Sequence, residues 1–143
     1  LIEKHIKHNN SSFYLCDLNF KMQKPSQIHI LNTSIHNLSM EETLSLVNDT
    51  IKNKESIHHV VVNAGKIVQM QKDNQLRESV NNSDIINADG QGVVWAAKFL
   101  NKSLKERVAG IDLMENLVEL AYKNNHKMVK KNPILNFKAW FYS

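Results

Sequence analysis

The sequence has a single cysteine, Cys16, so no internal disulfide can form. Because structural disulfides persist in oxidising compartments, this use of cysteine predicts a protein of the reducing cytoplasm. No stretch approaches the roughly 20 apolar residues that a helix needs to cross a bilayer, and the start of the chain, LIEKHIKHNN, lacks the apolar centre of a signal peptide. We therefore expect a cytoplasmic protein and only peripheral contact with any membrane.

Several ligand-binding signatures are also missing. Trp95 stands where a third glycine would complete the dinucleotide motif G-x-G-x-x-G begun by Gly90 and Gly92, and no Walker loop occurs. A nucleotide-binding oxidoreductase is therefore disfavoured. There is no Cys pair, and His58 and His59 are adjacent on an expected strand, where neighbouring side chains face opposite ways. We expect no metal and no cofactor, with one histidine at the edge of the core and the other exposed.

The net charge of +4 comes from the end of the chain. Residues 127–143 hold four lysines and no acidic residue, whereas the other 126 residues hold 14 basic and 14 acidic side chains. A neutral body argues against a nucleic-acid partner. The lysines of this tail lie among aromatic residues, and such segments can rest on an anionic membrane surface. The alternative is a non-native or disordered end.

The length of the chain and the change of residue composition along it predict one domain with two appendages. The 143 residues, 42% of them hydrophobic, suffice for one core. Residues 1–26 are rich in Lys, His and Asn and predict a polar arm, residues 27–126 predict the body, and residues 127–143 form the basic-aromatic tail. No internal repeat is visible.

Short apolar runs alternate with helical patterns in the body. Alternation of apolar and polar residues predicts a strand over residues 28–35, and β-branched runs predict buried strands over residues 57–62 and 84–88. Capping boxes that begin at Ser39 and Asp112 predict two helices. Apolar spacing predicts a helix from Ile67, which Leu76 and Val80 either continue or follow as a second helix, and another helix over residues 93–100.

Strands that alternate with helices build βαβ units. The sequence therefore predicts the α/β class, with a Rossmann-like parallel sheet and flanking helices. We expect the apolar residues, Trp95 included, to pack in its core.

Two polar turns follow expected strands, at the sheet edge where α/β proteins bind ligands. One contains Asn63, and the other is Asp89-Gly90-Gln91-Gly92. A carboxylate followed by two glycines lets a ligand or another backbone approach closely. The plainer alternative is that Asp89 caps the next helix and the glycines only serve the turn.

Three blocks of sequence, in order, resemble a known family: NTSIHNLSMEETL, VVVNAGKIVQMQKDNQLRESVNNSDIINADGQGVVWAAKFL and RVAGIDLMENLVELA. Over about residues 30–125 the chain resembles the WecG/TagA/CpsF glycosyltransferases, which add N-acetylmannosamine or related sugars in teichoic acid, enterobacterial common antigen and capsule synthesis. The resemblance implies an inverting transferase with a UDP-sugar donor and an undecaprenyl-diphosphate-linked N-acetylglucosamine acceptor. It places the reaction on the cytoplasmic membrane face and allows a homo-oligomer.

The resemblance also assigns roles to residues. Asp89 falls on the family's proposed catalytic carboxylate, and an ionised aspartate can take the proton of the acceptor hydroxyl during a direct displacement. No Asp-x-Asp is present to hold a cation on the diphosphate, so the protein itself must stabilise the UDP leaving group. For Asp112, a plain helix cap is the alternative to a place in the pocket wall. The substrate-binding positions that the resemblance implies are Asn63, Gly90, Gln91, Gly92, Gly110 and Asp112.

The chain departs from the family pattern in two places. Val61 stands where many relatives have threonine, so a polar contact is missing. After Asn125 the family continues with further βα units and with arginines that meet the diphosphate, whereas this chain reads HKMVKKNPILNFKAWFYS. We therefore expect a truncated chain of weak or absent activity. The alternative function is an inactive remnant that at most binds nucleotide-sugar.

Overall fold

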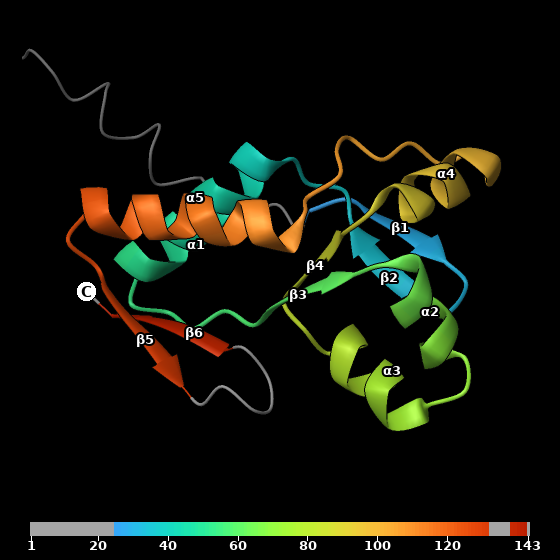
Figure 1. Cartoon of the computed structure of the whole chain (residues 1–143), viewed down its shortest axis with the longest axis horizontal. Helices are drawn as coiled ribbons and strands as arrows, with labels where there is room; N and C mark the ends of the chain where they lie inside the picture. Colours follow the sequence, from blue (N-terminus) through green and yellow to red (C-terminus); the bar gives the residue numbers. More distant parts are fainter. Residues whose placement is uncertain (1–24, 132–137, 143) are drawn as a thin grey trace, which may run out of the picture.

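The computed structural model describes residues 25–131 and 138–142 (Figure 1). All but the last two residues of the expected N-terminal arm, residues 1–26, lie outside this part. The elements in chain order are β1 (Gln27–Ile30), β2 (Thr33–His36), α1 (Met40–Lys52), β3 (His59–Val62), α2 (Ala64–Met70), α3 (Asn74–Asn81), β4 (Ile85–Ala88), α4 (Gln91–Phe99), α5 (Gly110–Lys123), β5 (Lys127–Lys131) and β6 (Lys138–Tyr142). Mixed helices and strands with a parallel strand pair confirm the predicted α/β class.

The first expected strand, over residues 28–35, is in fact a hairpin. β1 and β2 pair antiparallel, with Ile30 opposite Thr33, and Leu31 between them has a φ of 51°. Both Ile30 and Ile35 are buried. The alternation therefore marks the buried face correctly. It does not reveal the reversal, because a positive φ is uncommon for leucine and nothing in the apolar spacing signals it.

β3 and β4 form the parallel pair, with His59 opposite Ile85 and Val62 opposite Ala88. β4 is buried over its whole length, because β2 lies beside it and the Ile86 N–H donates to His36 Nδ1 at 3.0 Å. The parallel pairing agrees with the expected βαβ arrangement.

β3 is less buried than its apolar run predicts. Only Val62 of this strand is buried, since in the part of the chain described here no strand pairs with its other edge. The carbonyl of Val61 accepts a hydrogen bond from Lys66 Nζ at 2.8 Å. A lysine side chain therefore occupies part of the unpaired edge.

Two groups of helices flank the strands. Figure 1 shows α1 and α5 to the left of β3 and β4, and α2, α3 and α4 to the right. Val47 and Ile51 of α1 pack with Leu113 and Leu117 of α5, as the apolar spacing predicts. The capping box of α1 is confirmed: the Glu42 N–H donates to Ser39 Oγ at 3.1 Å and the Ser39 N–H donates to Glu42 Oε2 at 2.9 Å.

The expectation that Trp95 belongs to the core is wrong. α4 packs through Val93 and Ala97, which are buried, whereas Trp95 and Phe99 are exposed. Residues four apart share a helix face, so Trp95 and Phe99 lie together on the side opposite the buried pair.

The end of the described chain is a second hairpin. β5 and β6 pair antiparallel, with Lys127 opposite Tyr142. Both strands belong to the basic-aromatic tail, whose remaining residues lie outside the described part. Among the helices described, none has the length and apolar character needed to cross a bilayer.

Candidate functional site

Three segments meet at the carboxyl ends of β3 and β4. Asn63 directly follows β3, and Asp89 directly follows β4. The Asp89 N–H donates to the Val62 carbonyl at 2.8 Å, and the Val108 N–H donates to the Ala88 carbonyl at 2.9 Å. These bonds place the turn after β3, the turn after β4 and the start of α5 side by side, at the edge where α/β sheets bind ligands.

Asp89 provides the carboxylate of this edge. It is partly buried, and its Oδ2 accepts a hydrogen bond from the Gly110 N–H at 3.4 Å. This distance is long for an N–H···O bond, so the interaction is weak. The N-cap of α4 is Gly90, with no side-chain cap, so the alternative that Asp89 caps this helix is wrong. The carboxylate remains able to accept a proton or a hydroxyl donor.

Glycines allow the backbone to close around the carboxylate. Gly90 has φ 94° and ψ 149°, a conformation that is essentially restricted to glycine. A Cβ on Gly110 would lie 3.2 Å from Val61 Cγ2 and 3.6 Å from Asp89 Oδ2, and one on Gly92 would lie 3.3 Å from the Cβ of Ala64. Gly110 and Gly92 thus let α5 approach β3 and let α4 approach α2.

Three helices begin at this edge, namely α2, α4 and α5. Asn63 caps α2, because its Oδ1 accepts from the Lys66 N–H at 2.8 Å, whereas α4 and α5 have no side-chain cap. The free N–H groups and the dipole of a helix N-terminus attract anions. The edge therefore combines a carboxylate with two helix starts that have no cap from their own N-cap residue, although at α5 the first N–H, that of Gly110, already donates to Asp89.

Gln91 and Asp112 lie at the rim of this arrangement. Gln91 is the exposed first residue of α4. Asp112 is not a helix cap, which corrects the capping-box prediction, because α5 begins after Ala109 and Asp112 lies within its first turn. Its Oδ2 lies 3.7 Å from a guanidinium nitrogen of Arg107, and both side chains are about half exposed. The structure therefore places Asp112 beside Arg107.

A groove of about 490 Å³ runs along the unpaired edge of β3, between α3 and α5. Its lining includes Leu76 of α3, Leu113 of α5 and, toward the site, Lys66 and Gly110. Lys66 is a cation that sequence reasoning did not single out. Its position next to the cap residue Asn63 was the available signal.

His59 lies farther from the ligand edge. Its Nε2 is 2.8 Å from Asn87 Oδ1, and burial lowers the pKa of His59 below the ordinary histidine value. His58 is exposed. One histidine at the core edge and one exposed is the arrangement that the sequence predicts. Within the described residues, no group of three or more His, Cys, Asp or Glu side chains could hold a metal ion.

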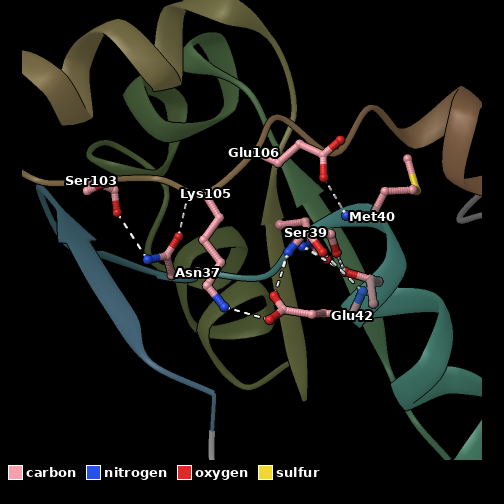
Figure 2. Close-up of polar contacts among 9 residues, drawn as sticks. Asn37, Ser39, Met40, Glu42, Ser103, Lys105 and Glu106 are labelled. Atoms are coloured by element: carbon pink, nitrogen blue, oxygen red, sulfur yellow. Dashed lines mark hydrogen bonds and ion pairs between the residues drawn. The ribbon is translucent and has the colours of Figure 1, made fainter.

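Four polar contacts fix the loop between α4 and α5, and we call them the polar clasp (Figure 2). Asn37 Nδ2 donates to the Ser103 carbonyl at 3.1 Å, and Asn37 Oδ1 accepts from the Lys105 N–H at 2.7 Å. Lys105 Nζ lies 2.6 Å from Glu42 Oε1, and the first N–H of α1 donates to Glu106 Oε2 at 2.8 Å. The clasp holds the loop that brings the start of α5 to the site.

A carboxylate beside helix starts lies at the carboxyl edge of the parallel strands, the edge at which α/β proteins bind their ligands. The chain belongs to the glycosyl transferase WecG/TagA/CpsF family, whose model matches residues 28–129. This match confirms the resemblance found in the sequence.

Curated relatives from Staphylococcus aureus are named N-acetylglucosaminyldiphosphoundecaprenol N-acetyl-beta-D-mannosaminyltransferase. The protein from strain NCTC 8325 / PS 47 is 29% identical over 105 residues, which are 72% of this chain and 41% of the relative. Those from strains COL and MSSA476 match to the same extent. The chain therefore spans about two fifths of the length of these relatives.

Proposed function

We propose that the chain forms the catalytic-base half of an inverting glycosyltransferase. In this proposal it moves N-acetylmannosamine or a related sugar from a UDP-sugar to an undecaprenyl-diphosphate-linked N-acetylglucosamine, in teichoic acid or other cell-surface polysaccharide synthesis. The supporting observation is the position of Asp89, which ends a buried parallel strand beside two uncapped helix starts. Family membership and the names of the relatives support the sugar and the acceptor.

The reaction assigns Asp89 the role of general base. The acceptor hydroxyl attacks the anomeric carbon of the donor, the bond from that carbon to the UDP oxygen breaks, and the hydroxyl proton passes to the Asp89 carboxylate. Because the Asp89 carboxylate accepts only one long hydrogen bond from the described residues, an incoming hydroxyl meets little competition for it. A positioned general base contributes about 10²–10⁴ in rate.

The leaving diphosphate needs positive charge. The uncapped start of α4 supplies N–H donors, and so does the start of α5 beyond Gly110, whose own N–H donates to Asp89. Two cations lie close to this edge: Lys66 is near the start of α2, and Arg107 precedes α5. We assign to these groups the stabilisation of the UDP phosphates.

The other candidate residues shape the pocket. The Asn63 oxygen is used in capping α2, so its amide nitrogen is the group that remains to donate to a sugar or acceptor. We propose that Gly90, Gly92 and Gly110 keep the floor open and that the exposed side chain of Gln91 reaches the donor. In the same proposal Asp112 orients Arg107 in the pocket wall. The protein works at the cytoplasmic membrane face as a peripheral protein, alone or as a homo-oligomer.

The test measures transfer from UDP-N-acetylmannosamine to a soluble lipid-diphosphate-N-acetylglucosamine analogue. Asp89→Asn keeps the shape of the side chain but removes the base, so we expect the rate to fall by about 10²–10⁴. Glu115→Gln makes the same change from acid to amide on an exposed residue of α5 that has no role in the proposal, and it should leave the rate unchanged. Equal rates for the two variants would refute the role of Asp89.

The second candidate function is binding of nucleotide-sugar without transfer, and the uncapped helix starts beside Asp89, which can hold a diphosphate, are the observation that favours it. A chain that only binds nucleotide-sugar gives heat in a calorimetric titration with UDP but no product in the transfer assay, so the two measurements together separate the candidates. The Asp89 change, introduced at the matched position of the Staphylococcus aureus relative, then tests the base in a longer chain.

A further inference from the structure

α4 presents two large aromatic side chains to solvent. Trp95 is 67% exposed and Phe99 is 88% exposed, and they lie one helical turn apart. The opposite face of α4, with Val93 and Ala97, packs against the core. Trp95 and Phe99 are therefore not needed to pack α4 against this core. Clustered apolar groups at a surface mark contact with a partner or a membrane.

The same stretch of chain is purely basic. Residues 90–105, which contain α4 and most of the following loop, include three lysines and no acidic residue. Lys98 is exposed on α4, and Lys102 Nζ donates to the backbone carbonyl of His29, so its charge is not neutralised there. Lys105 pairs with Glu42. Tryptophan side chains are favoured at the interface of a bilayer, and lysine side chains are attracted by anionic lipids.

α5 also exposes apolar residues, but its charge is different. Ile111 is 76% exposed and Tyr122 is 85% exposed. α5 carries three acids, Asp112, Glu115 and Glu119, and a single lysine, Lys123, which pairs with Glu119, so acids outnumber bases on this helix. An anionic surface would repel this helix. Exposed apolar area is thus present on both helices, and of the two only α4 has a lysine and no acidic residue of its own.

We propose that the outer face of α4, formed by Trp95, Lys98 and Phe99 and called the α4 patch, docks on an anionic phospholipid bilayer. The proposal rests on the proposed function, in which the acceptor is carried by a membrane lipid. α4 begins two residues after Asp89, and its first residue lies about 12 Å along the helix axis from Phe99 at 1.5 Å per residue. Docking of the patch therefore brings the Asp89 edge to the membrane surface, where a lipid-linked sugar is found.

Flotation of the full chain with vesicles tests the patch without donor or acceptor, so the result does not depend on transfer. The vesicles contain phosphatidylcholine with phosphatidylglycerol, or phosphatidylcholine alone. We expect the chain to float with the anionic vesicles and Trp95→Ser/Phe99→Ser to reduce binding about tenfold or more. Ile111→Ser/Tyr122→Ser, which also removes two exposed apolar side chains, should bind as the original chain does.

Fluorescence locates the contact. Trp140→Phe leaves Trp95 as the single tryptophan, so a blue shift with anionic vesicles and quenching by brominated lipid report on Trp95 directly. Absence of flotation, flotation without quenching, or equal flotation of the Trp95→Ser/Phe99→Ser chain would overturn the proposal. A change of oligomeric state in that variant without vesicles would instead assign the patch to a second copy of the chain, which also overturns it.

Discussion

Gly90→Ala should destabilise the protein through backbone strain alone. Gly90 has φ 94° and ψ 149°, a region that costs other residues on the order of 1–3 kcal/mol. Crowding is not the cause, because the nearest atom to an added Cβ is Asn63 Cβ at 4.0 Å. Alanine also restricts the unfolded chain, which returns about 0.4–1 kcal/mol where strain is absent. We therefore expect a net loss of about 1–2 kcal/mol in the free energy of unfolding.

Gly65→Ala is the matched control. Gly65 lies in α2, has no positive φ, and an added Cβ would meet Asn63 Oδ1 at an ordinary 3.5 Å. Alanine is the better helix former by about 1 kcal/mol, so this variant should be neutral or more stable. Urea unfolding followed by circular dichroism measures both midpoints, with the slopes compared to exclude a change in the unfolded state. Equal midpoints for the two alanine variants would refute the strain argument.

Two further predictions concern the polar contacts of the fold. Asn37→Ala should lower the free energy of unfolding by about 1–2 kcal/mol, because Asn37 makes two hydrogen bonds of the polar clasp. Lys105→Ala removes an exposed ion pair and should cost less than about 1 kcal/mol, so the opposite ranking in urea would contradict the bond assignment. Burial lowers the pKa of His59 from 6.5, so the unfolded chain takes up a proton on it at higher pH than the folded chain. The stability from this group is present above about pH 6.5 and is lost as pH falls toward the folded pKa. The urea midpoint should therefore fall less between about pH 7 and pH 5 in His59→Gln than in the original chain, whereas His58→Gln should leave this fall unchanged. Equal slopes of midpoint against pH for both variants would contradict the assignment of the pH dependence to His59.

A capping box in the sequence predicts the start of a helix correctly where the residues of that box themselves determine where the helix begins. Ser39 and Glu42 form the expected capping box of α1. The same pattern at Asp112 misled, because α5 begins before it. The Val108 N–H is held by the Ala88 carbonyl and Gly110 fits against Val61, so contacts between distant segments decide where α5 starts. No local rule contains those contacts.

The sequence predicts which strand ends form the candidate site, but it does not predict which other side chains lie next to them. Asn63 and Asp89 follow short apolar runs, and the carboxyl ends of parallel strands meet at one edge, so their proximity follows from the α/β class. Lys66 and the clasp of Asn37 arise from side chains that meet only after folding. Trp95 lies in the continuous apolar run VVWAA, which has no polar face, so periodicity could not show which side faces solvent.

The polar clasp has a consequence for the entropy of ligand binding. Its bonds join positions that lie 63 to 68 residues apart, so the loop before α5 becomes ordered when the chain folds. A loop that is already ordered loses little conformational entropy when a ligand binds. The entropic cost of binding is therefore smaller than for a loop that must become ordered around the ligand. Residues such as Asn37, which has no assigned contact with substrate, therefore influence affinity by limiting how many conformations the empty pocket can adopt.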